Sequence, residues 1–156
     1  MKAAAGRCSG SALVVVLLAG CGGPVTLPSD GIVPDAAQAC RGVVADLPDE
    51  LSDQPRVEAD GAPGAAYDGG ITVRCGVREP AALDPFSTCQ TVNDIDWYVP
   101  ESAIEDTGAD VVATTIARTP YVELVVPGDL RPPAAAFAQL TDVVADNTRR
   151  IGPACR

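Results

Sequence analysis

The first 21 residues most constrain what this chain can fold into, because they decide which residues belong to the folded domain and in which compartment it folds. Lys2 and Arg7 precede an apolar run of eight residues at 12–19. A transmembrane helix needs about 20 apolar residues, so this run is too short to span a bilayer. It is typical of the core of a secretory signal peptide. We therefore predict that residues 1–20 are a signal peptide.

The predicted signal peptide ends in Leu-Ala-Gly, directly before Cys21. This arrangement is typical of a lipobox, where a bacterial signal peptide is cut and the new N-terminal cysteine receives its lipid, such as palmitate. Ordinary secretion, with Cys21 incidental, is the alternative. We predict a lipoprotein that is attached through Cys21 to the outer face of the cytoplasmic membrane, outside the cytoplasm. Residues 21–34, rich in Pro and Gly, are expected to form the lipidated N-terminus and a flexible linker of on the order of 20 Å.

The charge of the mature chain argues against a nucleic-acid partner. Removing residues 1–20 takes away two of the 11 basic residues and none of the 21 acidic ones, which leaves a formal charge of −12. An acidic domain repels nucleic acid and anionic lipid head groups. We therefore expect no nucleic acid among the partners. The expected partners are the membrane, through the lipid anchor, and possibly another envelope protein.

Four cysteines remain in the predicted domain at 35–156: Cys40, Cys75, Cys89 and Cys155. An even number in an oxidising compartment predicts two disulfides. Zinc is the rival interpretation, but the spacings contain no C-x-x-C pair and the chain has no histidine. We predict Cys75–Cys89, across the turn between two consecutive strands, and Cys40–Cys155, which would join the two ends of the domain. The alternatives are Cys40–Cys75 with Cys89–Cys155, and the crossed pairing.

Hydrophobic periodicity predicts a single α+β domain in the order helix, four strands, helix. Apolar stripes at helical spacing run through 40–47, after Asp35 and before Pro48, and through 137–151. Runs with alternating or β-branched apolar residues predict strands at 71–77, 92–99, 111–117 and 121–126. The connections are too short for helical crossovers, so we expect a mainly antiparallel four-stranded sheet. The N-terminal and C-terminal helices are expected to pack on one face of it.

The sequence offers little catalytic chemistry. Without histidine there is no Ser-His-Asp or Cys-His site, and neither a P-loop nor a G-x-S-x-G motif is present. We therefore predict no catalytic residue and no cofactor. No metal site is predicted either, because the Asn93–Asp96 segment lacks the Gly and Glu of a calcium loop at the required offsets. Paired carboxylates could still hydrolyse a glycan.

The strand phasing places a candidate binding face on the side of the sheet away from the helices. Aromatic and charged side chains on an open sheet can form such a surface. An ordinary solvated face with cross-strand pairs is the alternative. The candidate residues are Arg74, Asp94, Asp96, Tyr98, Tyr121 and Glu123.

Three blocks carry a resemblance to a known family: Arg74-Cys75-Gly76-Val77, Asp96-Trp97, and the segment 118–127 with its Arg-x-Pro-Tyr-Val-Glu sequence. With these blocks the chain resembles the short actinobacterial lipoproteins of the domain-of-unknown-function 3515 type, from about Cys40 to Cys155. One departure is Tyr67-Asp68-Gly69-Gly70, where the family pattern has Trp-Gly before the first strand. The resemblance implies location and architecture, and it brings no activity with it.

Three functions are compatible with these observations. The first is a binding or accessory module for other components of the cell envelope, which is not an enzyme. The second is an envelope hydrolase that uses paired Asp and Glu carboxylates. The third is a small-ligand carrier, which requires a pocket that only a tertiary structure can reveal. We expect the first.

Overall fold

The computed structural model of the chain describes residues 23–87 and 89–153. The predicted signal peptide, the predicted lipidation site Cys21 and the cysteine Cys155 lie outside these residues. In the described part, no helix combines the length and the hydropathy needed to cross a membrane.

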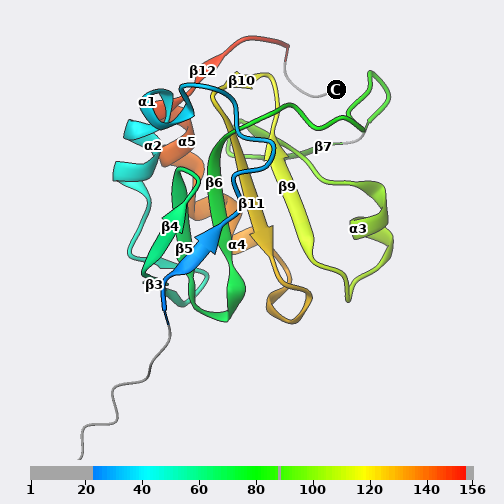
Figure 1. Cartoon of the computed structure of the whole chain (residues 1–156). Coiled ribbons are helices and arrows are strands. Elements are labelled where there is room, and N and C mark those ends of the chain that lie inside the picture. The colour runs from blue at the N-terminus through cyan, green and yellow to red at the C-terminus, as the bar shows by residue number, and fades with distance from the viewer. Residues whose placement is uncertain (1–22, 88, 154–156) are drawn as a thin grey trace, which may run out of the picture.

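A single large antiparallel sheet organises the domain (Figure 1). The prediction of an antiparallel sheet is confirmed, but the sheet has eight strands where four were predicted. In spatial order the strands are β2 (Glu50–Leu51), β3 (Gln54–Val57), β5 (Gly64–Tyr67), β6 (Thr72–Val77), β11 (Tyr121–Val126), β9 (Val111–Thr115), β8 (Ile95–Tyr98) and β7 (Cys89–Val92).

The additional strands are short and several are joined by tight turns, so they produce no long alternating pattern in the sequence. β2 and β3 are joined at Ser52 and Asp53, and β7 and β8 at Asn93 and Asp94, and all four residues have positive φ. Two consecutive positive φ values are typical of the two-residue turns that match the twist of a hairpin. The predicted strand at 92–99 is therefore wrong in its first part, because the chain reverses direction within it.

Two further strand pairs lie outside the large sheet. β1 (Val25–Leu27) runs parallel to β4 (Ala59–Gly61), and β10 (Arg118–Thr119) pairs with β12 (Arg149–Arg150). The second pair corrects the predicted C-terminal helix, which ends at Asn147 and is followed by a short strand.

The helices are short, and their placement differs from the predicted pair. The N-terminal helix is divided at Cys40 and the C-terminal one at Leu140, and a further helix lies apart from them near β9 (Figure 1). The helical elements are α1 (Ala36–Ala39), α2 (Arg41–Asp46), α3 (Glu101–Glu105), α4 (Ala134–Gln139), α5 (Thr141–Asn147) and the 3-10 turns η1 (Asp68–Gly70) and η2 (Gly128–Leu130).

One apolar cluster forms the main core between the inner face of the sheet and the helices. Val73, Leu124 and Trp97 from the strands pack with Val43 of α2 and Phe137 of α4, and all five are at most 4% exposed. Up to residue 144 the predicted helical stripes are buried, except that Val44 is half-buried, because their spacing keeps one side of each helix towards the sheet. Ile151, which was included in the second stripe, is instead exposed.

The segment 25–33, which we call the N-terminal strap, crosses the outer face of the sheet. Leu27 is 1% exposed in a second, smaller core cluster with Ala62 and Ala66. At the other end of the strap, the Val33 amide donates to the Gly76 carbonyl at 2.8 Å. The expected flexible linker is therefore wrong for these residues, because Leu27 is buried against the sheet and the strap backbone is hydrogen-bonded to it, which composition alone does not reveal.

A disulfide joins Cys40 to Cys75, with 5.8 Å between their Cα atoms. The predicted pairs Cys40–Cys155 and Cys75–Cys89 are therefore wrong. The prediction treated the strands of Cys75 and Cys89 as neighbours, whereas β11, β9 and β8 lie between β6 and β7. Four strand spacings of about 4.8 Å far exceed the separation of about 7 Å that a disulfide can bridge. Cys89 is also disulfide-bonded.

Candidate functional site

The six residues of the predicted binding face do not form one surface. The structure distributes them over three separate polar groups and one covered tyrosine. The physical reason is that segments before and after these strands, the N-terminal strap, the loop after β6 and the C-terminal β12, pack against the predicted face.

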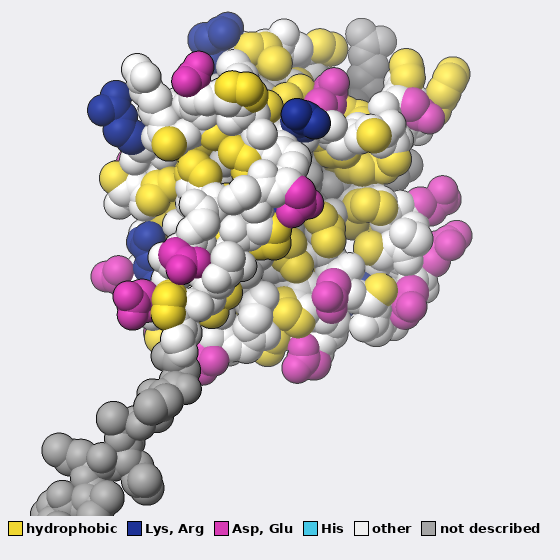
Figure 2. All heavy atoms as spheres, in the orientation of Figure 1, with side chains coloured by type: hydrophobic (Ala, Val, Ile, Leu, Met, Phe, Trp, Pro, Cys, Tyr) yellow, Lys and Arg dark blue, Asp and Glu magenta, His cyan; other side chains and the backbone are white. Residues whose placement is uncertain are grey.

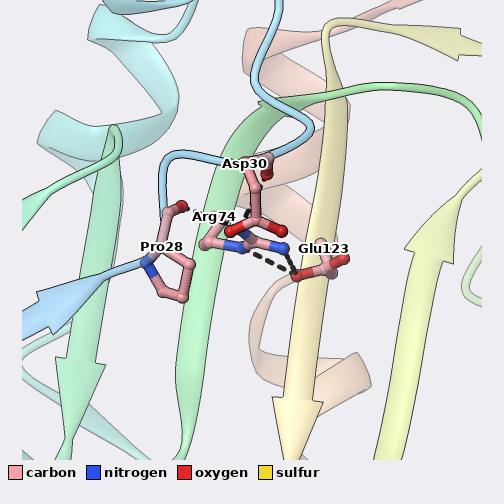
Figure 3. A network of polar contacts seen from close by, with 4 residues as sticks. All are labelled: Pro28, Asp30, Arg74 and Glu123. Carbon is pink, nitrogen blue, oxygen red and sulfur yellow. Dashed lines mark hydrogen bonds and ion pairs between the residues drawn. The ribbon is translucent and has the colours of Figure 1, made fainter.

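The first group is the ion pair between Arg74 and Glu123, which lies beneath the N-terminal strap (Figure 3). The residues are direct cross-strand neighbours on β6 and β11, with Nε and Nη2 of the guanidinium 2.8 and 2.7 Å from Glu123 Oε1. Arg74 Nη1 donates to the backbone oxygens of Pro28 at 2.7 Å and Asp30 at 3.2 Å. Both charged side chains are only 13% exposed. These two predicted residues therefore hold the strap on the sheet.

The second group surrounds Asp96, which is 2% exposed on β8. Its carboxylate accepts a hydrogen bond from Thr91 Oγ1 at 2.7 Å and forms an ion pair with Arg150 at 3.7 Å. Arg150 also donates to the backbone oxygen of Asp94, which lies in the β7–β8 turn and not on a strand face as predicted. Burial lowers the pKa of nearby Arg118, the positive charge of Arg150 lowers it further, and Asp96 opposes both. This group therefore ties β12 to β8 and to the β7–β8 turn.

Tyr98 was predicted to be exposed and is 8% exposed. It lines a small surface pocket together with residues of the loop 78–87, among them Ala82 and Phe86. The loop therefore takes Tyr98 out of any large open face, while Phe86 itself is 93% exposed.

The third group opens onto a cavity next to the predicted face. Tyr121 donates its hydroxyl to Glu79 Oε1 at 3.0 Å. Burial raises the pKa of Tyr121, and the hydrogen bond and charge of Glu79 raise it further. The two side chains lie in a cleft of about 660 Å³, which we call the upper cleft. Its described walls are Glu79, Leu83, Asp84, Pro85, Ser87, Cys89, Ile116, Ala117, Tyr121, Ile151, Gly152 and Pro153.

The upper cleft is acidic and apolar at once. Its described walls carry two carboxylates, Glu79 and Asp84, and no basic side chain. Asp84 is fixed by its own loop, since Oδ1 accepts from the Phe86 amide at 2.8 Å and from the Ser87 hydroxyl at 3.2 Å. Such a surface suits a ligand that combines a positive charge with an apolar group, because it offers carboxylate acceptors beside aliphatic walls.

Sequence reasoning found Tyr121 but missed the rest of the cleft. Glu79 and Tyr121 are 42 positions apart, and the segment between Cys75 and Cys89 was interpreted only as a turn between two strands. The two prolines of the loop 78–87 and its Asp-x-x-Ser motif, in which the Ser87 hydroxyl accepts from the Asp84 amide, indicate an ordered loop. This pattern could have predicted a wall of the cleft from the sequence.

Acidic side chains are spread over the outer side of the molecule, and apolar side chains are visible among them (Figure 2). Asp96 is the only acidic residue buried among the described residues. No group of three His, Cys, Asp or Glu side chains within 23–87 and 89–153 could hold a metal ion.

Comparison with known proteins gives one match. The model of a family described as "Protein of unknown function (DUF3515)" matches residues 15–151. No curated protein and no solved structure matches the chain. The match covers nearly the whole length, including the three blocks that carry the resemblance. The chain therefore belongs to the DUF3515 family of proteins of unknown function.

Proposed function

We propose that this protein is a lipid-anchored binding module of the cell envelope, which holds a partner in its upper cleft outside the cytoplasmic membrane. The observation that carries the proposal is the position of the cleft relative to the start of the domain. Gly23 lies by Gly70 and Thr72 at the beginning of β6, whereas Tyr121 of the cleft pairs with Val77 at its other end. Gly23 and the upper cleft thus lie near opposite ends of β6, and Figure 1 shows the course of this strand through the domain.

The N-terminal strap supports a close attachment to the membrane. With Cys21 lipidated, only residues 22–24 separate the anchor from β1. Four residue spacings reach at most about 14 Å when fully extended. The domain would then lie against the membrane with its N-terminal end towards the lipid. The upper cleft would face away from the membrane, towards partners in the envelope.

The chemistry of the cleft indicates what kind of partner it suits. Glu79, Asp84 and the aliphatic walls favour a protein segment that carries Lys or Arg next to an apolar side chain. The mature charge of −12 would attract such a segment and repel anionic lipid head groups.

A crosslinking experiment in intact cells tests the binding proposal. We would compare the full-length protein with Glu79→Gln and with Glu105→Gln, a matched change on exposed α3 outside the cleft. Mild crosslinking and purification from the envelope should recover a basic partner with the parent and with Glu105→Gln, and several-fold less with Glu79→Gln at unchanged thermal stability. Equal recovery with both variants would contradict the role of the cleft. Turnover of cell-wall glycan by the purified protein would instead support the hydrolase.

The anchor has its own test. We expect Cys21→Ala to accumulate as uncut precursor or to appear in the medium, and mass spectrometry of the parent to find acyl chains on Cys21. An unmodified N-terminus in the mature parent protein would refute the lipid anchor.

A further inference from the structure

A second cavity lies on the opposite side of the sheet, at the edge formed by β7. It has a volume of about 280 Å³ and lies between this edge, α3 and the beginning of α4. Its described walls are Gln90, Val92, Val99, Ile104, Val111, Arg131, Pro133, Ala134 and Phe137. We call it the edge pocket. None of its lining residues belongs to the upper cleft.

The described walls of the edge pocket are apolar except for two side chains, Gln90 and Arg131. A cavity of about 150 Å³ lined by aliphatic and aromatic groups is large enough to bind benzene. By that scale, the edge pocket accommodates an apolar group of roughly ten non-hydrogen atoms. Its size and lining therefore suit a small molecule with one compact hydrocarbon part.

Arg131 provides the charge that selects the polar part of such a molecule. Its Nη1 donates to the backbone oxygens of Ala103, Asp106 and Ala109, at 2.8, 2.9 and 3.1 Å. The guanidinium has three further N–H groups, on Nε and Nη2. These groups have no partner in the described part of the chain, where the ion pairs are those of Arg74 and Arg150.

A structural role explains only part of this arrangement. Through Nη1, Arg131 satisfies carbonyl groups at the end of α3 and in the loop after it, as basic side chains do at helix C-termini. That role uses one nitrogen of a side chain that also lines the edge pocket. The indole N–H of Trp97 is a second donor without a partner among the described residues, and its ring contacts Phe137 of the pocket at 4.9 Å between centroids.

We propose that the edge pocket binds a small monocarboxylate with a compact alkyl or phenylalkyl group. The carboxylate pairs with the Nε and Nη2 groups of Arg131, which match its two oxygens in the bidentate geometry that guanidinium groups favour. The apolar group fills the cavity against Phe137, Val99 and Val111. This ligand is distinct from the basic partner proposed for the upper cleft, and the two proposals stand or fall separately.

Trp97 makes the proposal measurable, because it is the only tryptophan in the chain and is in ring contact with a wall of the pocket. The purified full chain would be titrated with octanoate and 4-phenylbutyrate, and with octan-1-ol and octylamine as probes that lack the carboxylate. We expect a saturable change of fluorescence with both acids, and an affinity for octan-1-ol at least about tenfold lower, because charge-assisted hydrogen bonds are lost. The acids should also raise the melting temperature.

Three variants separate binding from folding. Ala134→Phe fills the mouth of the pocket from an exposed position and leaves Arg131 in place, so it should abolish the response to octanoate. Arg131→Gln should bring octanoate and octan-1-ol to similar affinity. Arg149→Gln removes an exposed arginine outside the pocket and should bind octanoate like the parent.

Three results would overturn the proposal. Equal binding of octanoate and octan-1-ol by the parent would remove the role of the charge. An unchanged response of the Ala134→Phe variant would place the acids elsewhere. Tighter binding of an apolar peptide with a free C-terminus than of either acid, lost on amidation, would assign the pocket to a chain terminus and not to a small molecule.

Discussion

Replacing Arg74 by methionine should release the N-terminal strap while leaving most of the sheet intact. Methionine keeps a long apolar side chain over β6 but removes both contacts to Glu123 and both contacts to the strap carbonyls. Breaking a fully buried ion pair by removing one partner costs about 3–5 kcal/mol. Because each side chain here is 13% exposed, solvent screens the remaining charge, and we expect a loss of about 2–3 kcal/mol.

The measurement combines urea unfolding with amide hydrogen exchange. The amides of Val25 and Ala62, which bond to Glu58 and Leu27, should exchange faster in the variant, whereas those between β9 and β11 should change only with the global stability.

Arg78→Met is the matched control, because the side chain of this exposed arginine forms no hydrogen bond or ion pair with the described residues. It should change the free energy of unfolding by less than about 0.5 kcal/mol. If Arg74→Met is equally mild and leaves strap exchange unchanged, the ion pair does not hold the strap and the reasoning is wrong.

Three further predictions concern the core. Replacing both Cys40 and Cys75 by alanine should lower the free energy of unfolding by about 4 kcal/mol, from the entropy of the loop that the disulfide closes, and peptide mapping without reduction should find the linked pair. Burial raises the pKa of Tyr67 to about 12, and its hydroxyl donates to the Pro48 carbonyl. The folded state therefore holds this proton more tightly than the unfolded state, so the contribution of Tyr67 to the free energy of unfolding is complete below pH 10 and falls between about pH 10 and 12. In alkaline unfolding experiments, Tyr67→Phe should lack this part of the pH dependence. Gly76→Ala should lower the melting temperature by several degrees, because Gly76 has φ +81° and a Cβ there would meet α1 at 2.4 Å; an unchanged value would contradict this packing.

The local periodicity of the sequence determined the elements with long runs. The strands β6, β9 and β11 and the apolar stripes of the helices could be predicted, because each requires only that one side of the element be apolar. Even where the helix boundaries were wrong, as after Asn147, the buried positions 137, 140 and 144 were identified.

The candidate site was only partly predictable, since its residues come from distant segments. The alternation of β6 and β11 correctly placed Arg74 and Glu123 on the outer face. It gave no information about what covers them, because the strap reaches them from more than 40 positions away. Tyr121 was identified for the same reason, whereas its partner Glu79 was not.

The sequence by itself determined the apolar pattern, the antiparallel character of the sheet and the expectation of disulfides. Only the tertiary structure decided the spatial order of the strands, and with it which cysteines pair. Cys75 and Cys89 follow one another along the chain, yet three strands inserted between β6 and β7 separate them, while Cys40 reaches Cys75 from between α1 and α2. The order of strands in a sheet depends on which strand edges pair when the whole core is buried. The residues of one strand indicate almost nothing about which strand lies beside it.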